Sequence, residues 1–398
     1  MKVALFHSQI PQGATKDEQD IMVQVEAISH ALSGLGHNPV IIPFSLNLEI
    51  TIGALQEAKP DMIFNLVETV NGSGRFVHLA PTILDYLNLP YTGSKTESLF
   101  LTSNKLLAKK VLEPLAIPTP KWISLESTPE KWAMMVADTD AGSTGLGNKG
   151  TESHPAMTAG TEAMTASCTS YIIKSVWEHA SIGLDEGSVI TADNAGQSFV
   201  SACVDSDKRT VGNMANMDNM DNMDNMDKYD QRIHQLRHTM QRRRERDGQD
   251  CFAEIYIEGR EFNLSLLEGD SGPEVLPPAE ILFEDYPAGK LKIVDYRAKW
   301  DEESFEYHHT PRCFDFPEED RPLLKQLAEL SKKCWDIFEL AGYARVDFRV
   351  DKAGKPWVLE INANPCISPD SGFAAAAKQA GLSFNQVILR IIKAASGA

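Results

Sequence analysis

Apolar positions in the first hundred residues follow two different periodicities. The short apolar runs at 2–7, 40–42 and 62–66 have the length of buried strands. Between the first two runs, apolar residues recur at steps of three and four, as on one face of a helix: Ile21, Val25, Ile28, Leu32 and Leu35. Strands that alternate with helices form parallel sheets covered by helices. The pattern predicts a doubly wound parallel sheet domain over residues 1–97.

Residues 98–253 combine regular and irregular segments. A helical pattern covers 102–115, and a short apolar strand begins at Tyr171. Residues 138–170 are rich in Gly, Ser, Thr and Ala without periodicity, and 205–250 contain an NMD repeat followed by an arginine-rich run. We interpret both stretches as disordered insertions in a central lobe. The repeat is then a tolerated loop expansion, and the alternative is a metal- or partner-binding arm.

The last third of the chain returns to regular patterns. Residues 252–268 alternate between apolar and polar positions and predict paired strands that turn at Glu258–Gly259. A long amphipathic helix is expected over 316–341, because apolar residues recur there at helical spacing. We expect a third lobe over 254–398.

A second hairpin is predicted within residues 344–365. Two apolar-rich strands flank a glycine turn, and centring the turn on its Ala-Gly pair places Asp347 opposite Glu360 and Arg345 opposite Asn362. Side chains alternate between the two faces of a strand, so all four residues share one face. Directly opposed side chains lie about 5 Å apart. Two carboxylates this close repel each other unless a cation joins them.

This face predicts a site for a hard metal ion. Its candidate ligands, Asp347, Glu360 and Asn362, offer only oxygen, which favours Mg²⁺ or Mn²⁺ over zinc. Such ions typically combine one or two carboxylates with substrate phosphates. Arg345 beside them would stabilise the charge of a phosphoryl or acyl-phosphate group. The alternative is a polar face of an exposed hairpin that Arg345 neutralises.

Charge and cysteine usage narrow the class of protein. The formal net charge of −18 over 398 residues disfavours nucleic acid and anionic membranes as partners. The six cysteines form no CxxC pair, which favours reduced thiols over zinc or disulfides. The apolar run at the N-terminus is too short for a signal peptide, and no stretch has the length of a membrane span. We expect a cytoplasmic protein.

Around the predicted hairpin the chain resembles the D-alanine–D-alanine ligase family of the ATP-grasp superfamily. The family signature E-x-N-x-x-P is present from Glu360 to Pro365, after Arg345-Val-Asp347. The resemblance covers most of the chain outside the two insertions and is strongest over 254–392. It implies an α/β ATP-grasp fold in which the three lobes are an N-terminal substrate lobe and two lobes that grip ATP.

The resemblance also implies roles for individual residues. Asp347, Glu360 and Asn362 match the ligands of two magnesium ions that bridge the ATP phosphates. The positions that match nucleotide-binding residues of the family are Lys105, Lys174, Ser181, Glu254, Ile257 and Glu261. Those that match residues acting on the reacting groups are Arg345, Lys299 and Ser371.

These nucleotide and catalytic roles are specific. Lys105 and Lys174 would reach the ATP phosphates, Glu254 would accept the adenine amino group, and Glu261 would bind the ribose. Lys299 would close on the transferred phosphate, and Ser371 would hold the carboxylate of the attacking amino acid.

The implied reaction joins two small amino acids in two steps. A substrate carboxylate attacks the γ-phosphate of ATP to give an acyl phosphate and ADP. An amine then attacks the acyl carbon and phosphate leaves. The resemblance suggests a homodimer.

Several departures from the family pattern cluster near the first-substrate pocket. The phosphate loop E-G-S-S-x-G reads E-H-A-S-I-G here, so that Ala180 replaces the first serine. Trp300 stands where tyrosine or phenylalanine is usual, and Cys366 replaces a glycine. The glycine-rich loop whose glutamate holds the first alanine's amino group is not recognisable near 8–20. Glu68 is a candidate for that ammonium group, and a strand-end carboxylate bound by local backbone is the alternative.

Three activities therefore stay open besides D-alanine ligation. They are an ATP-grasp ligase with a non-alanine substrate, a non-catalytic ATP-binding regulatory module, and a bicarbonate-dependent carboxylation that uses the same nucleotide site.

Overall fold

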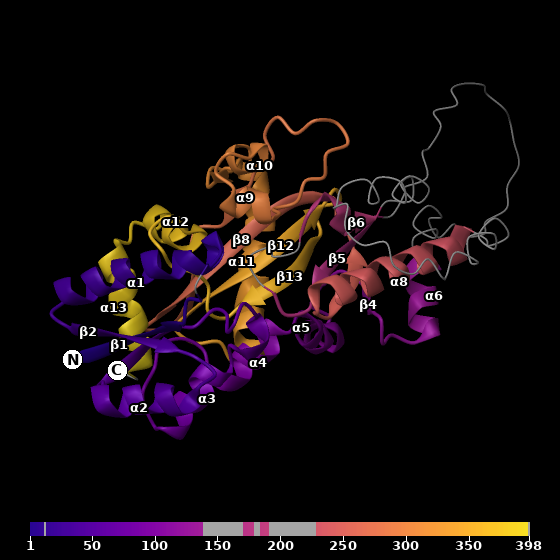
Figure 1. Ribbon diagram of the computed structural model, residues 1–398. Helices are drawn as coiled ribbons and strands as arrows, with labels where there is room; N and C mark the ends of the chain where they lie inside the picture. The colour runs from indigo at the N-terminus through magenta and orange to yellow at the C-terminus, as the bar shows by residue number, and fades with distance from the viewer. Residues whose placement is uncertain (12, 138–169, 179–183, 191–227, 397–398) are drawn as a thin grey trace, which may run out of the picture. The chain divides into compact units, whose positions relative to one another are not determined.

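The computed structural model describes residues 1–11, 13–137, 170–178, 184–190 and 228–396 (Figure 1). The chain divides into two compact units. Unit 1 comprises residues 1–120, 176–183 and 257–398, and unit 2 comprises residues 121–175 and 184–256.

Unit 1 begins with a three-stranded parallel sheet in the order β2-β1-β3. Its strands are β1 (Lys2–Ser8), β2 (Asn38–Phe44) and β3 (Met62–Leu66). Val3 and Leu5 of β1 pack into a cluster with helices α1 (Lys16–Gly34) and α13 (Phe384–Ala395). The alternate residues of β1 pack on the other face with α2 (Leu48–Ala58) and α3 (Leu79–Tyr86) (Figure 1). Helices cover both faces, which confirms the predicted parallel sheet with helices on its two sides.

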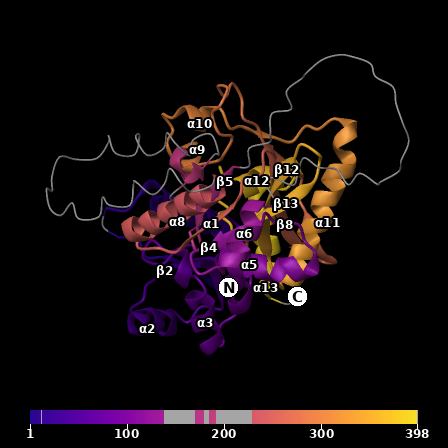
Figure 2. The same cartoon turned by 90° about the vertical axis from the view of Figure 1, so that its right-hand side faces the viewer.

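A larger sheet forms the second layer of unit 1. Its path is β11-β10-β8-β12-β13, with β9 paired to β8. The strands are β8 (Gly259–Gly269), β9 (Gly272–Val275), β10 (Ala279–Ile281), β11 (Arg312–Cys313), β12 (Tyr343–Asp351) and β13 (Pro356–Asn362). Helix α11 (Arg321–Ile337) lies along β8, β12 and β13 (Figure 2). It buries the same apolar stripe that predicts it, but it is shorter than the expected 316–341.

The remaining helices of unit 1 are short. They are η1 (Gly74–Phe76), α4 (Thr96–Ser103), α5 (Lys105–Leu112), η2 (Glu113–Leu115), α9 (Tyr296–Trp300), α10 (Phe305–His308), η7 (Glu318–Asp320) and α12 (Gly372–Gln379). The helix expected over 102–115 is thus broken at Asn104, whose side chain accepts the backbone N–H groups of Leu106 and Leu107 and starts α5 anew.

The β12–β13 hairpin has the predicted pairing at the end away from its turn. Asp347 pairs with Glu360 and Arg345 with Asn362. Near the turn, however, Phe348 pairs with Val358, which is one residue out of the predicted register. Leu359 is the extra residue of a β-bulge that restores the predicted pairing beyond it.

Unit 2 is built on a four-stranded sheet in the order β4-β7-β5-β6. Its elements are β4 (Trp122–Ser124), α6 (Pro129–Ala137), β5 (Tyr171–Ser175), η4 (Glu186–Ser188), β6 (Val189–Ile190), α8 (Lys228–Asp247) and β7 (Cys251–Ile255). Residues 138–169 and 191–227, which include the first predicted insertion and the NMD repeat, lie outside the described residues.

Helix α8 corrects the prediction of an irregular insertion up to residue 250. Leu236 and Met240 are fully buried in one cluster with the β-sheet of unit 2 and Trp132 of α6. Arg243, from the arginine-rich run, is also buried and donates to the Ile173 carbonyl at 2.9 Å. The composition of the segment hid a helix because its apolar face is narrow.

The predicted hairpin turn at Glu258–Gly259 is also wrong. β7 pairs with β4 and β5 in unit 2, whereas β8 pairs with strands of unit 1. Gly259 serves a different purpose: its φ is +155°, and a Cβ at this position would overlap the carbonyl oxygen of Val350 on β12. Glycine allows the two backbones to approach closely.

The described part of the chain contains no helix that is both long and apolar enough to cross a membrane. Its cysteines at 251, 313, 334 and 366 are free thiols.

We predict that Phe348→Ala lowers the free energy of unfolding by about 3–5 kcal/mol, because it opens a cavity in a closely packed core. Phe348 is fully buried on β12 and pairs with Phe262 on β8. Urea denaturation measures the change. Tyr86→Ala is the control, since Tyr86 is 76% exposed and should cost little. Equal costs for the two variants would contradict this account of the core.

Candidate active site

The acidic face of the hairpin is held in place by three strands. Asp347 on the central strand β12 pairs with Glu360 on β13 and with Asn263 on β8. Arg345 donates from Nε and Nη2 to the two oxygens of Asp347, each at 2.8 Å. The Asn263 amide donates to Asp347 Oδ1 at 2.7 Å. The carboxylate is therefore oriented by a bidentate cation on one side and an amide on the other.

Glu360 has its own cation. Lys105 Nζ lies 3.3 Å from Glu360 Oε2, and it also donates to the backbone carbonyl of Glu178. The Lys105 side chain is only 6% exposed. It is the first residue of α5, and its backbone N–H donates to the Val176 carbonyl at 3.0 Å. Lys105 thus joins the acidic face to the segment that follows β5.

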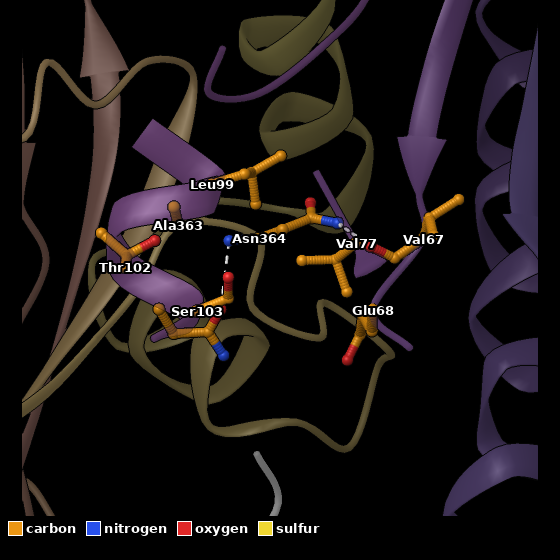
Figure 3. Close-up of a pocket in the computed structure, with 9 residues that line it drawn as sticks. Val67, Glu68, Val77, Leu99, Thr102, Ser103, Ala363 and Asn364 are labelled. Carbon is orange, nitrogen blue, oxygen red and sulfur yellow. Dashed lines mark hydrogen bonds between the residues drawn. The ribbon is translucent and has the colours of Figure 1, made fainter. Parts of the chain in front are cut away.

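The third candidate metal ligand opens onto a pocket. Asn362 lines it together with Glu68, Thr102, Ser103, Ala363 and Asn364, and with the apolar residues Val67, Val77 and Leu99. Asn362 Oδ1 accepts the backbone N–H of Asn364 at 3.1 Å. The Asn364 side chain reaches across to the Val67 carbonyl at 3.2 Å, as the dashed line in Figure 3 shows.

The charge of Lys299 interacts with the charged groups on the acidic face of the hairpin. Lys299 lies on the short helix α9, which Asp295 caps by accepting the backbone N–H of Ala298 at 2.9 Å. Burial, and then the positive charge of Arg345, lower the pKa of Lys299. Burial also acts against the charge of Arg345, but the Asp347 carboxylate outweighs it and raises the pKa of Arg345. Two cations thus share the field of Asp347 and Glu360.

Two further candidates face each other within unit 2. Lys174 on β5 and Glu254 on β7 form an ion pair of 2.6 Å between Nζ and Oε1. Glu254 is 1% exposed and Lys174 is 14% exposed. The antiparallel pairing of β5 with β7, in which Ile172 faces Glu254, brings the two side chains together.

The other candidates lie at element ends. Glu261 on β8 forms an ion pair of 3.1 Å with Arg349 of β12, and Ile257 lies between β7 and β8, next to the boundary of the units. Ser371 is the N-cap of α12, where its hydroxyl accepts the backbone N–H of Ala374 at 3.1 Å. Ser181 lies outside the described residues.

The pocket carries one carboxylate with an unusual environment. Gln24 on α1 is 1% exposed and donates from its amide to Glu68 Oε1 at 2.8 Å. Burial raises the pKa of Glu68 to about 7, although the hydrogen bond from Gln24 opposes the rise. The alternative that local backbone binds this strand-end carboxylate does not describe the contact found, because the donor comes from another element.

Sequence reasoning missed Asn263 and Gln24. Asn263 becomes visible only once β8 is known to be the neighbour of β12 in this register. Gln24 sits on the buried side of α1, where a polar residue between Ile21 and Val25 was a signal that the helix covers something polar.

We predict that Lys174→Met destabilises the protein by about 3–5 kcal/mol, since it takes away the cation that faces a buried carboxylate. Urea denaturation at neutral pH measures the cost. The double variant Lys174→Met with Glu254→Gln should recover most of the loss, because it removes both charges. If the double variant is as unstable as the single one, the ion pair is not the source of the effect.

The chain is similar to known proteins over most of its length. Residues 229–393 match the family model described as D-ala D-ala ligase C-terminus. A D-alanine–D-alanine ligase of Moorella thermoacetica is 26% identical over 98% of this chain and 98% of its own length. An uncharacterized protein, y4sG, of Sinorhizobium fredii is 24% identical over 93% of this chain and 86% of its own length.

Solved structures extend the match to the fold. The D-alanine–D-alanine ligase from Bacillus anthracis complexed with ATP superposes with a TM-score of 0.60 at 17% identity, covering 100% of this chain and 98% of that one. The family model covers the C-terminal part, and the relatives cover nearly the whole chain. The C-terminal part of the chain therefore matches the D-ala D-ala ligase model, and nearly the whole chain is similar to D-alanine–D-alanine ligases and shares their fold.

Proposed function

We propose that the chain is an ATP- and magnesium-dependent carboxylate–amine ligase that joins two small amino acids, with D-alanine the first candidate for both. The observation that carries this proposal is the hairpin register, which sets Asp347 against Glu360 and Arg345 against Asn362. A chain that only sensed ATP would have no need for a bidentate arginine on a metal-ligand carboxylate.

The residues present fit a hard divalent ion. Asp347, Glu360 and Asn362 provide only oxygen donors, and a cation already stands beside each carboxylate: Arg345 at Asp347 and Lys105 at Glu360. These three residues would hold Mg²⁺ or Mn²⁺, two ions by analogy with the family, and the ions would neutralise the phosphates of ATP.

ATP as the phosphate donor rests on the family and on its solved members, one of which is described as complexed with ATP. The nucleotide residues we assign are Lys105, Lys174, Ser181, Glu254, Ile257 and Glu261. Lys174 and Glu254 belong to unit 2, and Lys105, Ile257 and Glu261 belong to unit 1.

The chain's own contribution to the reaction is positioning and charge stabilisation. The first amino acid's carboxylate oxygen attacks the γ-phosphorus of ATP, the bond to the bridging oxygen breaks, and ADP leaves. The amine of the second amino acid then attacks the acyl carbon, loses a proton and expels phosphate. Arg345 and Lys299 are the cations we assign to the charge that builds up on the phosphoryl and acyl oxygens. Ser371 would orient the second amino acid through its carboxylate.

D-alanine is the first substrate to try because the similar protein of Moorella thermoacetica is a D-alanine–D-alanine ligase. The departures from the family pattern at Ala180, Trp300 and Cys366 make other small amino acids the next ones to test. The deciding experiment gives the purified chain ATP, Mg²⁺ and a panel of small amino acids of both configurations and measures ADP release. ADP release that depends on an amino acid supports a ligase. ATP binding without turnover on any member leaves the regulatory module, and release that depends on bicarbonate indicates carboxylation.

We predict that Asp347→Asn lowers amino-acid-dependent ADP release by at least about 100-fold, because it weakens a ligand and removes a charge that act on the transition state. Circular dichroism and thermal unfolding verify that the variant folds. Asp336→Asn is the matched control, since Asp336 is an exposed residue of α11 on the far side of the core. Activity within a few-fold of the unchanged chain for Asp347→Asn would overturn the metal assignment.

We also predict that Asn263→Leu raises the Mg²⁺ concentration needed for half-maximal ADP release by about 10-fold or more, as loss of a group that orients a metal ligand generally does. The leucine keeps the volume of the side chain and removes the donor to Asp347 Oδ1. The Mg²⁺ dependence at saturating ATP measures this effect. An unchanged dependence would show that Asn263 has no part in orienting Asp347.

A further inference from the structure

Glu68 follows β3 at its carboxyl end and lines the same pocket as Asn362. In Figure 3 Val67 and Glu68 lie on one side of this pocket, and Thr102 and Ser103 lie on the other. A carboxylate and a candidate metal ligand therefore share one cavity. A zwitterionic ligand could place its two charged ends against them.

The orientation of the Glu68 carboxylate is determined by Gln24. The backbone N–H of Ile367 donates to Gln24 Oε1 at 2.6 Å, so the amide oxygen must point toward Ile367. The amide nitrogen then points toward Glu68, and it donates to Oε1 at 2.8 Å. Because Gln24 is almost fully buried, its amide is not free to exchange these hydrogen bonds for bonds to solvent. Gln24 thus keeps the Glu68 carboxylate oriented as a hydrogen-bond acceptor.

Among the residues that the structure describes, the charged and titratable groups around Glu68 do not balance its negative charge. Asp20 of α1 adds a second negative charge, and Arg345 of β12 is the cation that acts on Glu68, but the Nε and Nη2 atoms of Arg345 donate to Asp347. The Cys366 thiol and the Tyr343 hydroxyl also face this region, and burial raises the pKa of both groups, which keeps them neutral. The missing positive charge is the kind that a ligand ammonium supplies.

We infer that Glu68, held by Gln24, is the binding site for the ammonium group of the first amino acid. This inference deepens the proposed function and rests on it for the identity of the ligand. It assigns to α1 and the end of β3 the role that a glutamate in the family's glycine-rich loop has elsewhere. Glu68 is a binding residue, and Gln24 is a positioning residue that acts through it.

The pocket also limits the ligand. The pocket is small, since its empty space of about 320 Å³ includes open solvent at the mouth. Apolar side chains, Val67, Val77 and Leu99, line the part between the polar groups. The first amino acid is therefore a small aliphatic one, and a long or charged side chain has no partner here among the residues that line the pocket.

The first experiment follows Glu68 directly. The chain is labelled with glutamate enriched in ¹³C at the carboxyl group, the Glu68 signal is assigned with Glu68→Gln, and its pH titration is recorded by NMR. We expect a midpoint near pH 7 from the raised pKa of Glu68. Gln24→Leu should move the midpoint upward, because it removes the donor that stabilises the carboxylate. Gln19→Leu, an exposed glutamine on the same helix, should leave the midpoint unchanged.

The second experiment adds ligand to the same titration. Glycine, D-alanine, L-alanine and D-serine are tested one at a time with Mg²⁺ and a non-hydrolysable ATP analogue. The amino acid that binds should lower the midpoint, because its ammonium stabilises the charged carboxylate. Propionate has the carboxylate and the aliphatic chain but no amine, and it should not lower the midpoint. If none of the four amino acids shifts the Glu68 signal, the inference is wrong, whether or not the chain is a ligase.

Kinetics separate binding from chemistry. For the amino acid that supports ADP release, Glu68→Gln should raise its KM about 10- to 100-fold, the usual loss for a charge-assisted hydrogen bond. The KM for ATP and the kcat at saturating amino acid should change much less. In the unchanged chain the KM should rise as the pH falls below 7, and in Glu68→Gln it should not depend on pH in this range. Glu57→Gln, an exposed glutamate of α2, is the matched control.

The two proposals fail in different ways. Absence of ADP release with every amino acid, together with a ligand-induced shift of the Glu68 signal, would remove the ligase and keep the ammonium site. Turnover with an unaltered KM in Glu68→Gln would keep the ligase and remove the ammonium site.

Discussion

The structure depends on how the fold offsets the repulsion between two paired carboxylates. Asp347 and Glu360 are opposed across two paired strands, and a pair of carboxylates at that spacing is unfavourable in a poorly hydrated site. Cations from two elements offset this repulsion: Arg345 lies on the same strand as Asp347, and Lys105 lies at the start of α5. Lys299, on α9, adds a further positive charge.

The same logic orders the elements around the site. β12 needs β8 on one side to supply Asn263 and β13 on the other to supply Glu360. The buried faces of these strands, with Phe262 and Phe348, pack on α11 and hold the polar faces in register. The N-terminal sheet is joined to this layer through α1, whose Gln24 reaches both Glu68 and the Ile367 backbone. Rigid layers thus position each polar group.

Local patterns in the sequence were enough for the N-terminal domain, because a run of apolar residues and a helical stripe depend on near neighbours only. They were enough for the Asp347–Glu360 pairing, although the predicted turn was shifted and the bulge at Leu359 compensates. They failed for the hairpin turn expected at Glu258–Gly259, because the choice of sheet partner depends on residues far apart in the sequence. They also failed for helix α8, because its narrow apolar face lies in a segment of mostly polar composition. Asn263 and Gln24 needed strand order and helix rotation, which no local pattern contains.

The bulge at Leu359 has a consequence for how this hairpin can change. The residue pairing near the turn differs by one residue from the pairing at Asp347 and Glu360. The bulge therefore makes the register at the turn independent of the register at the acidic pair. Loss of one residue from β13 can be absorbed by flattening the bulge, with the carboxylates still opposed. The turn of this hairpin can therefore vary in length among related sequences, while the end that carries Asp347 and Glu360 cannot.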